Sequence, residues 1–182
     1  TEEKLKALVW TTTPWTLPMN QALAYHNDFT YEVWENAAQE KVVLQNSDQV
    51  SEWLQENGYV FSKNCKFSEL NVSHETSPLS LLQAPVLQAD FVEEGMTGFV
   101  HMACAHGPED FELGVKNGLL PKTYLNKYGA FEVPENSPFA VLNGKKKDKV
   151  AQDVVELLKA NGLFVSHSQG MAEQNVCWRH KK

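Results

Sequence analysis

A run of hydroxyl side chains near the start of the chain could hold a polar ligand. Residues 10–20 read Trp-Thr-Thr-Thr-Pro-Trp-Thr-Leu-Pro-Met-Asn. Threonines favour a strand, but Pro14 and Pro18 lack the N–H that a strand ladder needs, so a strand must end here. The hydroxyls can then bond a ligand while the indoles exclude water. Strand propensity followed by a proline turn would explain the same residues without any ligand.

A second segment, residues 97–111, combines a histidine with an acidic residue at a predicted strand-to-helix turn. The period of a strand directs His101 away from the more aliphatic face. Asp110 falls in the first turn of a helix that follows Gly107, where the helix dipole stabilises a carboxylate. His101 and Asp110 therefore each have a structural interpretation as well as a functional one. His106 lies in the turn, where it could either begin the helix or bind a ligand.

Metal and thiol chemistry fit these residues poorly. Cys104 falls on the strand face opposite His101, and His106 lies beyond the end of the strand. A Cys-His nucleophile would need both groups within hydrogen-bond reach. The three cysteines form no CxxC pair, and no GxSxG or P-loop motif occurs. We therefore expect no metal and no covalent nucleophile.

The composition indicates one globular domain. A chain of 182 residues with 42% hydrophobic and 21% charged residues can bury a core, and no apolar stretch is long enough to span a membrane. The net charge of −7 and the single arginine, Arg179, argue against a strong autonomous nucleic-acid binder. The lysines of residues 145–147 read as a solvated loop. Without an initiator methionine or signal peptide, the chain looks like an excised soluble domain, and we expect a monomer in the reducing cytoplasm.

Short apolar segments outnumber helical ones. Strands are predicted at residues 5–12, 22–25, 31–34, 41–44, 59–62 and 98–103. Helices are predicted from residue 47 or 48 to Asn57-Gly58, from Gly107 to Asn117-Gly118, and from a cap at Asp148 to Asn161-Gly162. We expect an α/β domain with a β-rich, barrel-like core and a few peripheral helices.

Three motifs together resemble the inserted editing (CP1) domain of isoleucyl-tRNA synthetase, a class I synthetase. They are residues 10–20, the Thr97-Gly98-x-Val100-His101 to Gly107-x-x-Asp110 segment, and the terminal Cys177-Trp178-Arg179. The resemblance spans nearly all of residues 1–182. The leucine- and valine-specific relatives typically carry an arginine after two threonines, which favours the isoleucine type here. The chain departs from the family pattern at Met96, at Cys104 and in residues 169–176.

The resemblance implies hydrolytic proofreading, which removes valine from isoleucine tRNA, with valyl-adenylate as a further candidate substrate. A second, hydrolytic site is needed because one missing methylene gives little discrimination; isoleucyl-tRNA synthetase is the standard example of this principle. By motif position, Asp110 would bind the α-ammonium group. Thr11, Thr12 and Thr13 would hold the ester, the terminal ribose and the water, and Thr16 and His101 would border the side-chain pocket. Trp10, Trp15 and Asn20 would also contact substrate, although packing or turn formation explains them equally well.

The resemblance also implies partners and limits. The partners would be the aminoacylated 3′ end of isoleucine tRNA and, in cis, the catalytic core of a parent synthetase. This domain would need no cofactor, since ATP and Mg²⁺ serve the synthetic core, whose HIGH and KMSKS motifs are absent here. Two alternatives stay open. One is an editing site of valine or leucine type, and the other is a non-catalytic module that presents the tRNA end.

Overall fold

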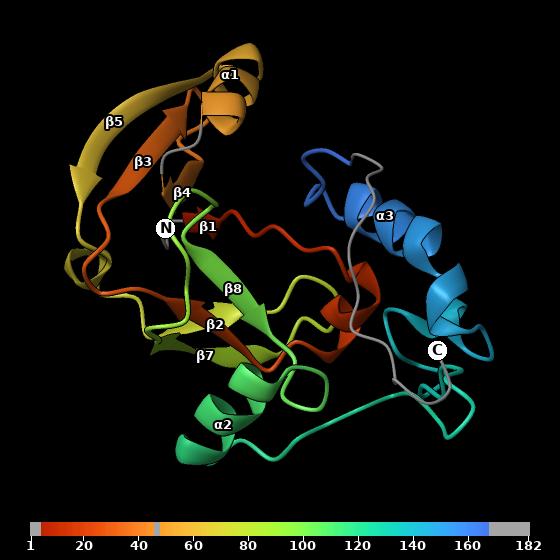
Figure 1. Ribbon diagram of the computed structural model, residues 1–182. Coiled ribbons are helices and arrows are strands. Elements are labelled where there is room, and N and C mark those ends of the chain that lie inside the picture. Colours follow the sequence, from red (N-terminus) through yellow and green to blue (C-terminus); the bar gives the residue numbers. More distant parts are fainter. Residues whose placement is uncertain (1–4, 46–47, 168–182) are drawn as a thin grey trace.

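The computed structural model describes residues 5–45 and 48–167, and its strands form two mixed sheets (Figure 1). The first has the order β1-β4-β3-β5, from Leu5–Ala7, Lys41–Gln45, Tyr31–Asn36 and Tyr59–Cys65. The second has the order β6-β7-β2-β8, from His74–Thr76, Gln83–Gln88, Ala22–Tyr25 and Phe99–Met102. β1 is parallel to β4 and β2 to β7, whereas the other pairs are antiparallel.

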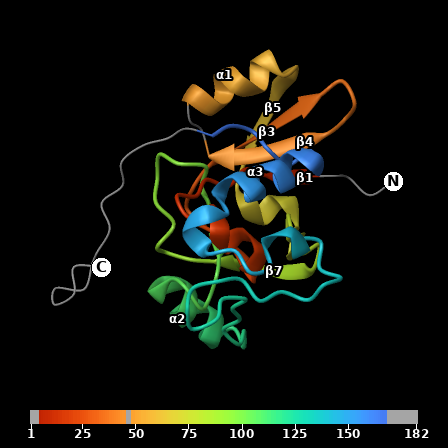
Figure 2. The ribbon, with the colours of Figure 1, turned by 90° about the vertical axis from the view of Figure 1, so that its right-hand side faces the viewer.

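Three α-helices and four short 3-10 helices complete the described part of the chain. The α-helices are α1 (Asp48–Glu56), α2 (Pro108–Lys116) and α3 (Ala151–Ala160). The 3-10 helices are η1 (Pro14–Met19), η2 (Phe67–Leu70), η3 (Ala140–Leu142) and η4 (Lys147–Lys149). Figures 1 and 2 show α1 and α2 at opposite ends of the molecule. None of the described helices is long and apolar enough to cross a membrane.

The two central strands of the first sheet, β3 and β4, bury side chains on both faces of the sheet. Val33 and Trp34 are neighbours in β3 and therefore point to opposite faces of the sheet, and both are buried. Trp34 belongs to a cluster with Leu54 of α1. Val33 belongs to a second cluster that also contains Leu23 and Phe99 of the other sheet. This second cluster therefore joins the two sheets.

Gly98 fixes the entry to β8, the strand that carries His101. Its φ is +75°, and a Cβ at this position would lie 2.7 Å from Gln45 Cβ and 2.8 Å from the Tyr31 ring. The Tyr31 hydroxyl donates to the Gly98 carbonyl at 2.8 Å. Only glycine fits this backbone conformation and close approach.

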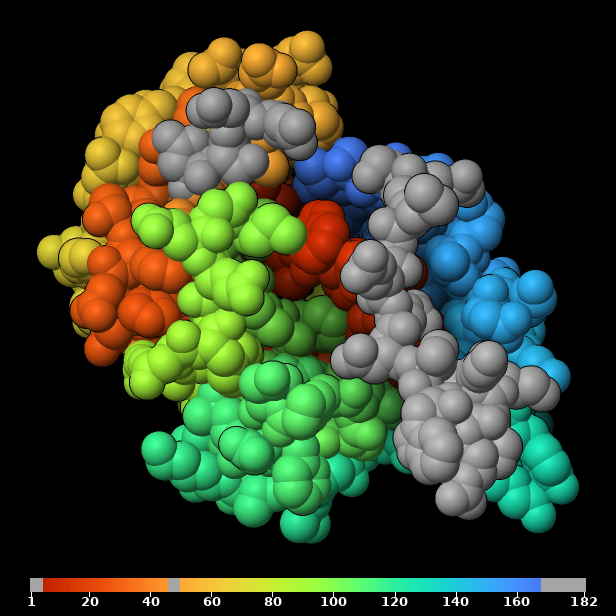
Figure 3. All heavy atoms as spheres, viewed as in Figure 1, coloured from red at the N-terminus to blue at the C-terminus, as the bar shows by residue number. Residues whose placement is uncertain are grey.

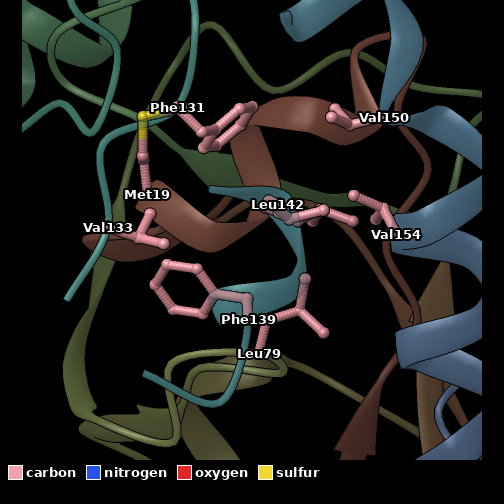
Figure 4. Close-up of a cluster of buried hydrophobic side chains, with 9 residues drawn as sticks. Met19, Leu79, Phe131, Val133, Phe139, Leu142, Val150 and Val154 are labelled. Carbon is pink, nitrogen blue, oxygen red and sulfur yellow. The ribbon is translucent and has the colours of Figure 1, made fainter. Parts of the chain in front are cut away.

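A separate core forms between η1 and the C-terminal third of the chain. Met19 of η1 belongs to a buried cluster with Phe131, Leu142 and Val154, shown in Figure 4. Since Val154 lies on α3, this helix packs against η1 and supports it from one side.

The predicted α/β class is confirmed, but the barrel-like core is not, because the described strands form two open sheets. The first strand ends at Ala7, earlier than predicted, so the threonines lie outside it. The strands β6 and β7 were not predicted. Asp148 is not the cap of α3: it lies in η4, and Val150 occupies the N-cap position. Arg179 and the terminal Cys-Trp-Arg motif lie outside the described residues.

Candidate functional site

A pocket of about 330 Å³ brings the two polar segments together. Its walls come from residues 10–16, from residues 91–101 and from the turn at the start of α2. Figure 3 shows the surface hollowed where the red N-terminal segment meets the green segments near residue 100. Seven of the predicted site residues line it: Trp10, Thr11, Thr12, Thr13, Thr16, His101 and Asp110.

The threonine hydroxyls form a connected cluster. Thr11 Oγ1 accepts a hydrogen bond from the Thr13 backbone N–H at 3.0 Å and lies 3.3 Å from Thr13 Oγ1. Thr13 Oγ1 is 3.5 Å from Thr16 Oγ1. The Thr12 side chain is exposed. The two prolines of η1 favour a tight turn directly after the threonine run, and threonines from four positions line one pocket.

Thr16 selects the tautomer of His101. Thr16 Oγ1 lies 2.7 Å from the Thr13 carbonyl oxygen, which can only accept, so the hydroxyl donates there. The same Oγ1 lies 3.0 Å from His101 Nε2, so Nε2 must carry the hydrogen and donate. His101 Nδ1 is then a lone-pair acceptor, and it is buried without a partner among the described residues.

His101 is neutral at physiological pH, because burial lowers its pKa to about 4. The unfolded chain binds a proton at this histidine below a pH of about 6.5, whereas the folded chain does not. The free energy of unfolding should therefore fall as the pH falls from 6.5 towards 4. His101 alone should remove roughly 2 kcal/mol at pH 5.

Urea unfolding at pH 7 and pH 5 tests this expectation. His101→Gln should lose less stability over this interval than the native protein does. Equal losses in the two proteins would show that His101 is not held neutral by burial.

Asp110 connects the end of β8 to the start of α2. Its Oδ2 accepts a hydrogen bond from the Ala103 backbone N–H at 2.9 Å. Gly107, the N-cap of α2, leaves room for this carboxylate, since a Cβ there would lie 2.9 Å from Oδ2. Burial raises the pKa of Asp110, the Ala103 hydrogen bond lowers it, and Glu109 raises it. Burial therefore opposes the effect of the helix dipole, on which the sequence prediction of an ionised acid rested.

The two tryptophans occupy different places. Trp10 lines the pocket with 56% of its surface exposed. Trp15 does not line it and instead packs edge-on against His106, at 5.0 Å between ring centroids. Lys147 of the lysine run lies over the Trp15 ring, 4.8 Å from its centroid. His106 does line the pocket, and its Nε2 lies 3.2 Å from Met19 Sδ.

Asn20 lies outside the pocket wall. Its side chain is buried, and its amide donates to Glu75 Oε1 at 2.6 Å and to Ser77 Oγ at 2.8 Å. Phe91, Val92 and Glu93 also line the pocket, although they lie outside both polar segments that the sequence singled out. They belong to a connecting segment with no motif, so no local pattern pointed to them.

The described residues offer little for metal or thiol chemistry. No three of their His, Cys, Asp and Glu side chains form a cluster that could hold a metal ion. Cys104 is buried in a core cluster. Its sulfur packs so closely on Gly114 that a Cβ there would lie 2.5 Å away. Burial also raises the pKa of this thiol, which disfavours a thiolate.

Sequence comparison relates the chain to isoleucine–tRNA ligases. The chain is 32% identical over 185 positions to an isoleucine–tRNA ligase of Proteus mirabilis. This alignment covers 100% of the chain and 19% of the ligase. The ligase of Edwardsiella ictaluri is 30% identical over 181 positions, covering 97% of this chain and again 19% of the relative. No family model matches. The chain thus spans about a fifth of the length of these curated relatives.

Structure comparison identifies the fold. The crystal structure of GlLeuRS-CP1 superposes with a TM-score of 0.70 at 15% identity, covering 94% of this chain and 87% of that one. This likeness establishes the fold, and the family assignment rests on the sequence. Over its whole length the chain is homologous to a segment of the isoleucine–tRNA ligases, and it has the CP1 editing-domain fold.

Proposed function

We propose that the pocket hydrolyses the ester bond of wrongly charged tRNA and removes valine from isoleucine tRNA. Valyl-adenylate is a further candidate substrate. The observation that carries the proposal is the placement of the threonine cluster, His101 and Asp110 on one 330 Å³ pocket. An aminoacyl ester presents an ammonium group, a carbonyl and a small side chain, and these three groups match the polar and apolar parts of the wall.

Each group has a role in this proposal. The Asp110 carboxylate receives the α-ammonium, and the threonine hydroxyls orient a water towards the ester carbonyl. The bond between water oxygen and carbonyl carbon forms, the bond to the ribose oxygen breaks, and a proton passes to that ribose oxygen. The neighbouring ribose hydroxyl helps to position the water. Neutral His101, held by Thr16, limits the volume left for the amino-acid side chain.

The rest of a parent synthetase would supply the synthetic core with its ATP and Mg²⁺, and most of the tRNA contacts. We propose this in part because the chain is acidic and spans 19% of its relatives. The domain would act as a monomer in the cytoplasm.

Deacylation of isoleucine tRNA charged with valine, threonine or isoleucine tests the function. Loss of valine with retention of isoleucine supports it. Binding without turnover would indicate a module that only presents the tRNA end. Preference for a different amino acid would indicate an editing site of valine or leucine type.

Chelation of metal ions should leave this hydrolysis unchanged. The proposed chemistry uses hydroxyls, a carboxylate and water, and no triad of ligands faces the pocket among the described residues. The rate is measured before and after dialysis against a chelator, with Mg²⁺ supplied to keep the tRNA folded. A loss of rate that zinc restores would contradict the proposal.

A further inference from the structure

We propose that Glu75 is a positioning residue of the hydrolytic site, which acts by holding Asn20 and with it the 3-10 turn η1. The inference rests on the proposed function. Asn20 and Glu75 form a hydrogen-bonded pair, here called the clamp, which holds η1 in place, and Asn20 is not a substrate ligand. Glu75 belongs to β6, in a part of the chain that carries none of the motifs.

Both hydrogens of the Asn20 amide are already used inside the protein. The amide nitrogen lies 2.6 Å from Glu75 Oε1 and 2.8 Å from Ser77 Oγ, and Ser77 is fully buried. Asn20 itself is 8% exposed and does not line the pocket. No donor of this side chain therefore remains for a substrate.

The clamp is connected to the pocket through η1. Asn20 follows the last residue of η1, and its backbone N–H donates to the Leu17 carbonyl at 3.2 Å. The same turn carries Thr16. Its hydroxyl donates a hydrogen bond to the Thr13 carbonyl and accepts one from His101 Nε2. A change in the angle of this turn would therefore move Thr16 and His101 together.

The polar clamp is needed because the apolar side of η1 fixes only part of its position. Leu17 and Met19 pack against the cluster that includes Val150 and Val154. Apolar packing is not directional, whereas a short hydrogen bond to a carboxylate fixes an angle. Burial raises the pKa of Glu75 and the Asn20 hydrogen bond lowers it, so the amide helps to keep the carboxylate charged.

An exchange of the two groups tests the clamp. Asn20→Asp alone places two carboxylates together and should reduce kcat about 10- to 100-fold, because small displacements of reacting groups have large effects on rate. Adding Glu75→Gln restores an amide-to-carboxylate hydrogen bond with donor and acceptor exchanged, and Ser77 can then donate to residue 20. The double variant should recover to within about threefold of the native kcat, with KM little changed.

The matched control is the exposed pair Asn126 and Glu132, whose amide and carboxylate lie 2.8 Å apart far along the chain. Asn126→Asp, Glu132→Gln and their combination should each leave kcat unchanged. If Asn20→Asp fails to fold, Glu75→Leu should lose the same activity while Glu75→Gln keeps it, since glutamine retains an acceptor. Equal activities of these two variants would overturn the proposal.

Two measurements separate this inference from the proposed function. If the native protein hydrolyses no aminoacyl ester, the proposed function fails. The clamp is then tested by the thermal midpoint, which should be lower in Asn20→Asp and recover in the double variant. If the native protein is active but the double variant stays as slow as Asn20→Asp, the clamp is refuted and Asn20 acts on the substrate directly.

Discussion

Replacing Asp110 by alanine should slow the hydrolysis of valine-charged isoleucine tRNA by two to three decades. An ammonium group is costly to transfer from water into a pocket unless a carboxylate receives it. Loss of one partner of such a pair removes about 2–4 kcal/mol of transition-state stabilisation. The measurement is single-turnover deacylation together with the thermal midpoint of the same variant.

The contact with Ala103 requires a second variant. Asp110→Ala removes the acceptor of the Ala103 N–H as well as the charge, so some loss of stability is expected in any case. Asp110→Asn keeps an oxygen that can accept this hydrogen bond and removes only the charge. We expect it to be nearly as stable as the native protein and nearly as slow as Asp110→Ala.

Glu109→Gln is the matched control, because Glu109 is the neighbouring acid in the first turn of α2 and is exposed. It should affect the rate by less than threefold, since an exposed acid here contributes only about 0.3–1 kcal/mol to the helix. Near-native hydrolysis by Asp110→Asn would reduce Asp110 to a link between β8 and α2. The proposed recognition of the ammonium group would then fail.

Replacing His101 by alanine should admit isoleucine and cause the protein to deacylate correctly charged tRNA. The imidazole lines the pocket and is held by Thr16, so it cannot swing aside to accept a larger side chain. Forcing an extra methylene into a packed site costs about 1–3 kcal/mol, which corresponds to about one or two decades of discrimination. The comparison is the ratio of the valine and isoleucine deacylation rates.

His74→Ala provides the control, since His74 is an exposed histidine of β6 whose ring hydrogen-bonds the neighbouring Ser73 hydroxyl and does not line the pocket. It should leave the ratio unchanged. His101→Gln, which keeps a bulky polar side chain, should retain more discrimination than His101→Ala. If His101→Ala still spares isoleucine and removes valine at the native rate, the histidine supports the fold and does not limit the pocket.

The sequence by itself determined the local elements and the groups that could do chemistry. Ala22–Tyr25 and the helix after Gly107 lie where apolar pattern and turn residues predicted them, because these signals act between neighbours in the chain. The alternation of side chains along β8 correctly predicted that His101 and Met102 point to opposite faces. His101 lines the pocket, whereas Met102 is buried in a core cluster. The motifs of residues 10–20 and 97–110 also pointed to the family, and sequence comparison agrees.

Only the tertiary structure decided how those groups are held. The His101 tautomer depends on Thr16, 85 residues away in the chain. The orientation of the Asn20 amide depends on its hydrogen bond to Glu75, 55 residues away. The strands β6 and β7 depend on pairing with distant segments, since β7 pairs with β2 and β6 pairs with β7. Likewise, burial sets the direction of the pKa shift of Asp110 against its helix position. Hydrogen-bond partners, strand edges and desolvation arise from contacts between distant segments, and no local pattern in the sequence records them.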